Sequence, residues 1–146
     1  MKKKLDNPTP PTIALGVTGS IAAYKSAEIA SRLTQAAVDV HVLMTESATR
    51  LVQPMTFQTV SRNPVTTSLW DVPDWRPRHI ALADRTDLLV VAPATANFLA
   101  KYVHGLADDA LTTFAISHDG PVIVAPAMNP KMWRHPATQE NVRILK

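Results

Sequence analysis

Residues 13–20 read IALGVTGS, and this stretch decides the fold class. The apolar run 13–17 has the length of a buried strand, and Thr18-Gly19-Ser20 after it predicts a tight turn. Residues 20–35 then have a helical composition. Small side chains form a stripe on this helix that can pack closely on a sheet, and they are Ala23, Ser26, Ala27 and Ala30. The stretch therefore predicts a strand, a turn and a helix that covers the sheet.

Three more apolar runs continue the alternation of strand and helix. We predict strands at 38–44, 88–92 and 122–125, the last two ended by Pro93 and Pro126, a short extra strand at 65–67 and an irregular loop at 71–78. Helices are expected after Thr45-Glu46-Ser47, from Pro54, at 79–84, 97–104, 107–117 and 136–146, with a turn or helix from Asn129-Pro130. This order implies a three-layer, Rossmann-like (flavodoxin-like) α/β fold, in which helices cover both faces of a parallel sheet.

Length and composition indicate the number of domains and the class of partner. The 146 residues suit one domain, which we place at 13–146 after a Lys- and Pro-rich leader, 1–12, expected to be disordered. Lys2, Lys3 and Lys4 account for the net charge of +3, so the body is close to neutral and nucleic acid is not an expected partner.

The absence of cysteine excludes disulfides, cysteine-bound zinc and thiol nucleophiles from this sequence. No histidine pair has a metal-binding spacing, so no metal site is expected. No apolar run reaches the roughly 18 residues that span a bilayer, and no secretion signal is evident. We therefore expect a cytoplasmic protein without a membrane partner.

In parallel sheets, ligands bind outside the carboxyl ends of the strands. The turn Thr18-Gly19-Ser20 offers two hydroxyls, a glycine that lets backbone approach a ligand, and a helix start that suits phosphate. The alternative is a plain turn in which Ser20 caps the helix. The stretch matches neither GxGxxG nor the P-loop pattern, so both interpretations stay open.

Two further segments follow strands. In Pro93–Phe98 the small residues leave room for a flat ring, and Thr95 and Asn97 can hydrogen-bond it, although Asn97 taken alone suits a helix cap better. In Pro126–Trp133 the Asn129 amide can bind a carboxylate or cap the next helix. The methionines and Trp133 suit either packing or an interface.

Ionisable side chains give weaker signals. Histidine as a residue type titrates near neutral pH, so His79 is a candidate base, although a single histidine is more often structural. Asp108-Asp109 form a candidate pair of carboxylates, but helix capping or a solvated face is the better interpretation.

The order of these motifs is more specific than any one of them. Their sequence along the chain is Gly19-Ser20-Ile21-Ala22, Thr45, His79-Ile80, Pro93–Asn97, Gly105–Asp109 and Pro126–Asn129 with Met132-Trp133. In this order they resemble the homo-oligomeric flavin-containing cysteine decarboxylases, above all the phosphopantothenoylcysteine decarboxylase branch, often the N-terminal half of a bifunctional coenzyme A biosynthesis flavoprotein. The pattern PxMNxxMW at 126–133 is its most specific part.

The resemblance implies a role for each motif. FMN would be held by Gly19, Ser20 and Ile21 at its phosphate, by Thr45 and Ser47 at the flavin or ribityl chain, and by Thr95, Ala96 and Asn97 at the ring. His79 would be the catalytic histidine. Asn129 would bind the substrate carboxylate, with Met132 beside it. Subunits would assemble as trimers that share FMN and substrate.

The resemblance also implies a reaction. FMN would oxidise the cysteinyl side chain of 4′-phosphopantothenoylcysteine, CO2 would leave, and reduction of the enethiol would give 4′-phosphopantetheine. Alternatives are a peptidyl-cysteine decarboxylase that stops after oxidation and a non-catalytic FMN-binding regulatory subunit.

Two features depart from the family pattern. A cysteine on a flap after the PxMNxxMW region donates a proton in the family, and this sequence has none. We expect that the sequence stops before that flap, and that a chain ending here has an impaired reductive step. Phe98 stands where threonine is common.

Overall fold

Four parallel strands form the centre of the molecule. The structure is a computed structural model that describes residues 9–70 and 78–146, with the side chains of 78–80 excepted. The strands are β1 (Thr12–Val17), β2 (Asp39–Met44), β3 (Leu88–Ala94) and β4 (Val122–Pro126). The helices are α1 (Ala23–Gln35), α2 (Glu46–Thr49), α3 (Pro54–Ser61), α4 (Arg78–Ala83), α5 (Ala96–Val103), α6 (Ala110–Ser117), α7 (Pro130–Arg134) and α8 (Pro136–Leu145).

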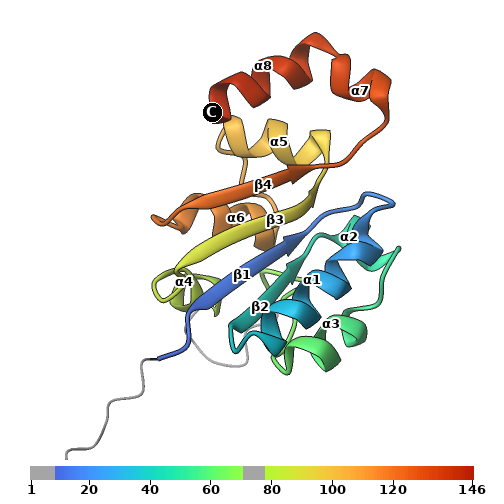
Figure 1. The fold of residues 1–146 in the computed structure, drawn as a ribbon. Helices are drawn as coiled ribbons and strands as arrows, with labels where there is room; N and C mark the ends of the chain where they lie inside the picture. The colour runs from blue at the N-terminus through green and yellow to red at the C-terminus, as the bar shows by residue number, and fades with distance from the viewer. Residues whose placement is uncertain (1–8, 71–77) are drawn as a thin grey trace, which may run out of the picture.

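The strand order is β2-β1-β3-β4, with every neighbouring pair parallel (Figure 1). The chain passes from β1 to β2 on one side and later to β3 on the other, so the order reverses between β1 and β3. In open α/β sheets a ligand crevice forms at this reversal, beyond the carboxyl ends of the strands. The architecture confirms the expected three-layer fold and shows which two strands flank the crevice.

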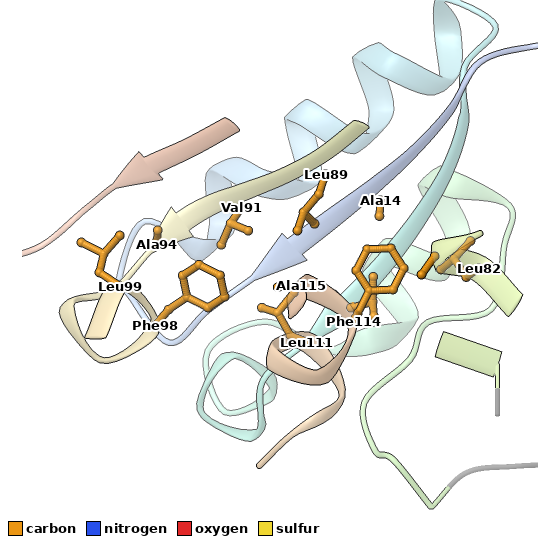
Figure 2. Close-up of a cluster of buried hydrophobic side chains, with 12 residues drawn as sticks. Ala14, Leu82, Leu89, Val91, Ala94, Phe98, Leu99, Leu111, Phe114 and Ala115 are labelled. Atoms are coloured by element: carbon orange, nitrogen blue, oxygen red, sulfur yellow. The ribbon is translucent and has the colours of Figure 1, made fainter. Parts of the chain in front are cut away.

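Side chains alternate between two hydrophobic cores, one on each face of the sheet. On one face α1, α2 and α3 cover Leu15 and Val17, and on the other α4, α5 and α6 cover Ala14 and Leu43. Figure 2 shows the second core, where Phe98 of α5 and the α6 side chains Leu111 and Phe114 lie near β1 and β3. Successive strand residues point to opposite faces, so one apolar run supplies both cores.

Gly16 lets α6 approach β1 closely. A methyl group on Gly16 would lie 2.6 Å from Leu111 Cδ1 and 3.3 Å from Val91 Cγ2. Leu111 is fully buried and has little room to move aside. The glycine in IALGV is therefore required by packing against the helix.

Several boundaries differ from the predictions, each for a tertiary reason. β1 begins at Thr12, one residue inside the expected leader, because its N–H donates to Asp87 Oδ2 at 2.7 Å. β3 passes through Pro93 to Ala94 by way of a cis Ala92–Pro93 bond and a shift in register with β4. The extra strand at 65–67 is a single bridge from Thr66 to Leu43.

The last strand and the end of the loop predicted at 71–78 differ from the sequence pattern. β4 lies at an edge of the sheet and Ile123 is 54% exposed, which its apolar sequence does not indicate. In the predicted loop, Arg78 begins α4, and 71–77 lie outside the described residues. Helices α1 and α6 begin at Ala23 and Ala110, each three residues later than predicted.

A polar network joins elements at the amino end of the sheet, opposite the crevice. Asn63 donates from Nδ2 to Asp39 Oδ1 and to the Val40 carbonyl, both at 2.8 Å. His41 Nε2 lies 3.0 Å from Asp39 Oδ2 and 3.1 Å from an Arg85 guanidinium nitrogen. Burial alone would raise the pKa of Asp39, but hydrogen bonds from His41 and Asn63, with the charges of His41 and Arg85, lower it below 3.8.

We expect Asp39→Asn to lower the free energy of unfolding at neutral pH. The carboxylate of Asp39 is stabilised in the folded state, so its contribution is present above its ordinary pKa of 3.8 and is lost as pH falls through the lowered folded value. Urea unfolding of both proteins from about pH 7 to about pH 3 measures this contribution. The gap between wild type and variant should shrink toward acid, and a gap independent of pH contradicts the prediction.

Candidate functional site

A pocket of about 470 Å³ opens at the carboxyl edge of the sheet, beside the reversal between β1 and β3. Its walls come from the loops after the first three strands and from α5, α6 and α7. The lining residues are Thr18, Gly19, Thr45, Glu46, Ser47, Thr95, Ala96, Asn97, Phe98, Lys101, Asp108, Asp109, Thr112 and Met132.

A second hollow of about 610 Å³ adjoins this pocket and shares part of its wall. It lies between the loop after β1 and the loop after β4. Its lining residues are Gly19, Ser20, Ile21, Ala22, Thr95, Ala96, Ala127, Met128, Asn129 and Met132. The two cavities together bring side by side all the sequence-predicted site residues whose side chains the structure describes, although these lie after four different strands.

The hydroxyl of Thr18 joins the two strands that flank the crevice. It donates to the Pro93 carbonyl at 2.7 Å and accepts from the Thr95 backbone N–H at 3.0 Å. Thr18 is 1% exposed, so water cannot replace these bonds. Ser26 of α1 adds a buried bond, from its hydroxyl to the Ala92 carbonyl at 2.6 Å.

The helix caps differ from those considered in the sequence. Thr45 and Thr95 are the N-caps of α2 and α5, and their hydroxyls accept from the backbone N–H groups of Ala48 and Phe98. Asn97 therefore lies inside α5, exposed at the pocket, and does not cap the helix. Ser20 does not cap α1 either, because the N-cap is Ala22 and no side chain caps it.

Gly19 holds the loop after β1 against the loop after β2. A methyl group on Gly19 would overlap the Ser47 side chain and lie 3.2 Å from the Ser47 backbone carbonyl carbon. A residue with a side chain would push these two walls of the pocket apart. The glycine is therefore needed for close approach of the loops.

The end of β4 presents Asn129 to the second hollow. Its side-chain Oδ1 accepts from the Lys131 N–H at 2.7 Å and so caps α7, as one of the two interpretations expected. The cap uses the amide oxygen and leaves the amide nitrogen for another partner. Asn129 can therefore cap a helix and bind a ligand at the same time.

His79 lies in the first turn of α4, and its side chain is outside the part of the chain that is described. α4 packs through Leu82 and Ala83 into the core that it shares with α6. The catalytic role expected for His79 therefore stays a prediction.

Charged residues at the pocket were only partly foreseen. Asp109 is the N-cap of α6 in a capping box with Thr112, which confirms the capping interpretation. Asp108 instead binds Lys101, and hydrogen bonding from Lys101 lowers the pKa of Asp108 below its ordinary value. Lys101 was missed, because it lies in α5 and Asp108 lies in the connection between α5 and α6, so no single helical or strand period relates the two residues.

Phe98 explains one departure from the family pattern. Its ring is 2% exposed and stacks on Tyr102 with the ring centroids 5.7 Å apart. The side chain therefore fills the core below the pocket while its edge forms part of the floor.

No helix among the described residues combines the length and the apolar character that crossing a bilayer demands.

Comparisons with known proteins agree with this geometry. A family model described as Flavoprotein matches residues 1–146. The chain is 46% identical over 136 residues to the coenzyme A biosynthesis bifunctional protein CoaBC of Bacillus subtilis (strain 168), covering 91% of this chain and 33% of that protein. It is 44% identical over 137 residues to a protein of Streptococcus mutans named "Probable phosphopantothenoylcysteine decarboxylase", covering 92% of this chain and 76% of that protein.

Among solved structures, the FMN-dependent cysteine decarboxylase SpaF matches with a TM-score of 0.88 and 35% identity, covering 94% of this chain and 79% of that chain. The chain thus spans about a third of the bifunctional relatives and about three quarters of the single-function relative.

We expect Thr18→Val to destabilise the fold by about 1–3 kcal/mol, because it leaves the buried Thr95 N–H without its acceptor while keeping the side-chain shape. Chemical denaturation measures the change. The matched control is Thr59→Val in α3, where an exposed hydroxyl bonds only to its own helix, and we expect it to stay within about 0.5 kcal/mol. Equal effects at the two positions would refute the role of the Thr18 hydroxyl.

Proposed function

The chain belongs to the flavoprotein family, and on this premise we propose that it binds FMN and decarboxylates 4′-phosphopantothenoylcysteine to 4′-phosphopantetheine in coenzyme A biosynthesis. The observation that carries the proposal is the meeting of three hydroxyl-bearing loops around one pocket at the reversal between β1 and β3. This is where α/β folds of this topology bind flavin mononucleotide.

The residues present fit a phosphate at the start of α1. The N-cap side chain makes no capping bond and no acidic residue lies in the first turn, so the positive dipole end of α1 suits an anion. The Ala23 and Lys25 N–H groups already donate to the Ser20 and Ala22 carbonyls, so a phosphate here would rely on the dipole and on the remaining donors of the turn. Gly19 and Ser20 bring the backbone close to this point, with Ile21 beside them. We assign the phosphate of FMN to this end of the site.

The walls next to it fit a polar chain and a flat ring. Thr45 and Ser47 supply hydroxyls on one side, and we assign them to the ribityl chain or the flavin. Thr95, Ala96 and Asn97 form the opposite wall, where the small Ala96 leaves space for a ring and the exposed Asn97 amide can bond to its edge. Thr18 holds the Thr95 backbone in place from below.

The second hollow fits the substrate. Because it shares Thr95, Ala96 and Met132 with the first pocket, a substrate in one cavity touches a ring in the other. Asn129 would donate its amide to the substrate carboxylate and so orient the bond that breaks. Met128 and Met132 would exclude water from that bond.

FMN, when bound, supplies a two-electron acceptor and donor for the cysteinyl carbon and sulfur. The chain positions the substrate and handles protons. We assign His79, at the start of α4, to proton removal from the substrate or to its positioning, as histidine titrates near neutral pH.

Assembly into homotrimers is part of the proposal. Ile21 is 81% exposed and Tyr24 62% exposed, both on the first turns of α1 or just before it, and Trp133 is exposed beside the second hollow. Apolar side chains exposed at the rim of a site suit a contact with another subunit that would close it. A cytoplasmic location also stays a prediction.

A second candidate is an FMN-dependent decarboxylase of another cysteine-containing molecule, such as a peptide. The similarity to SpaF favours this class as well. A non-catalytic flavin-binding subunit is the remaining alternative, and it predicts flavin binding without turnover.

We expect the wild-type chain to bind FMN near one equivalent, with the shifted absorption bands of a protein-bound flavin. Gly19→Ala should weaken binding by roughly tenfold or more, because the added methyl displaces the Ser47 loop and the hydrogen bonds that it offers. The matched control is Gly105→Ala, where nothing lies within 4 Å of the added methyl and only the backbone angle of +66° is strained. A colourless wild type after incubation with excess FMN would sink the flavin assignment.

Turnover distinguishes the candidate activities. With FMN bound, we expect the chain to release CO2 from 4′-phosphopantothenoylcysteine, and Asn129→Ala to raise KM strongly while retaining bound FMN. Mass spectrometry of the products tells full conversion to 4′-phosphopantetheine from accumulation of the enethiol. CO2 release only from a C-terminal cysteine of a peptide would favour the second candidate, and flavin binding without CO2 from either substrate would favour the regulatory subunit.

A further inference from the structure

The ion pair between Lys101 and Asp108 has no role in the function proposed above, although both residues line the first pocket. We propose that the Lys101 ammonium group binds an anionic group of the ligand, a phosphate or a carboxylate. In the absence of ligand, Asp108 forms an ion pair with this ammonium group, and the ligand displaces Asp108 when it binds. The inference rests on the proposed function, which makes FMN and 4′-phosphopantothenoylcysteine the ligands.

The cation is held in place, whereas its partner is the more exposed member of the pair. Lys101 Nζ lies 2.8 Å and 2.9 Å from the two carboxylate oxygens of Asp108. The Lys101 side chain is 21% exposed and that of Asp108 is 64% exposed. Water can therefore solvate Asp108 when it leaves, while Lys101 stays at the pocket wall.

Asp108 and Asp109 are neighbours in sequence but have different structural roles. Asp109 caps α6, where its Oδ1 accepts from the Thr112 N–H at 2.7 Å and from the Thr112 hydroxyl at 2.9 Å, and its Oδ2 lies 3.9 Å from Lys101 Nζ. Among the described residues, the Asp108 carboxylate hydrogen-bonds to Lys101 and to its own backbone, and it caps no helix. Releasing Asp108 therefore costs little structure, and Asp109 keeps Lys101 near its position.

The charges that line the pocket explain why an anionic ligand would have to displace Asp108 from Lys101. Three carboxylates line the pocket, those of Glu46, Asp108 and Asp109, and Lys101 is the one cationic side chain among its described lining residues. Both proposed ligands are anions, and the pocket repels them unless a cation is available. Exposed ion pairs like Lys101–Asp108 are weak, whereas a phosphate or carboxylate bound inside a pocket forms a charge-assisted hydrogen bond of greater strength.

The displacement model predicts effects of opposite sign for the two partners. We expect Lys101→Met to weaken ligand binding by roughly tenfold, the loss of about one charge-assisted hydrogen bond. Asp108→Asn removes the competing anion and should tighten binding several-fold. The double variant should bind like Lys101→Met, and Lys101→Arg should restore most of the affinity.

Three titrations distinguish which anion Lys101 binds. FMN and riboflavin are each titrated by flavin fluorescence, and 4′-phosphopantothenoylcysteine is titrated against the FMN-loaded protein by the change in flavin absorption. If the FMN phosphate is the partner, the variants change the affinity for FMN and not for riboflavin. If a substrate anion is the partner, both flavins bind normally and the substrate affinity changes. Either result supports the inference.

Arg32→Met is the matched control. It removes the cation of a different ion pair, Arg32–Glu28 on the exposed face of α1, and it changes the net charge by the same amount as Lys101→Met. Circular dichroism and thermal melting establish that each variant is folded. If the ion pair is purely structural, Lys101→Met and Asp108→Asn weaken ligand binding alike. That result, or no change in any titration, contradicts this inference and leaves the proposed function standing. A wild type that binds neither flavin nor substrate overturns the proposed function and this inference together.

Discussion

The hydroxyl of Thr18 is the contact on which the site depends most. It is buried at the reversal of strand order, where it bonds to the carbonyl of Pro93 and to the N–H of Thr95. These bonds set the spacing between the end of β1 and the start of α5. Because Thr95 then caps α5 with its own hydroxyl, one buried group determines the position of two walls of the pocket.

Close packing extends this constraint to the rest of the crevice. Gly16 allows α6 to lie tightly against β1, and α6 carries Thr112 and its cap Asp109 into the pocket wall. Gly19 allows the loop after β2 to touch the loop after β1. The pocket is therefore built by backbone approach between loops, and hydroxyl and amide groups line it because each loop also begins a helix.

The described lining of the pocket combines neutral donors with the Lys101 cation and the carboxylates of Glu46, Asp108 and Asp109. The positive dipole end of α1, with no acidic residue in its first turn, is where we propose that a phosphate binds. Farther along the wall, Lys101 is paired with Asp108. This division suits the anionic cofactor and the anionic substrate that we propose for the two adjoining cavities.

Local pattern in the sequence was enough to determine the four strands, most helices and the loops that form the site, because strand and helix periods and turn residues act over a few positions. Asn97 is not a cap, because β3 runs past Pro93 to Ala94 and Thr95 becomes the N-cap of α5. Ser20 is not a cap, because its carbonyl accepts from the Ala23 N–H in a turn and α1 begins only at Ala23. Only the tertiary structure decided that β4 is an exposed edge, that Gly16 and Gly19 are packing requirements, and that Lys101 meets Asp108 across the α5–α6 turn. Such contacts depend on distances between segments remote in sequence, and no local pattern encodes those distances.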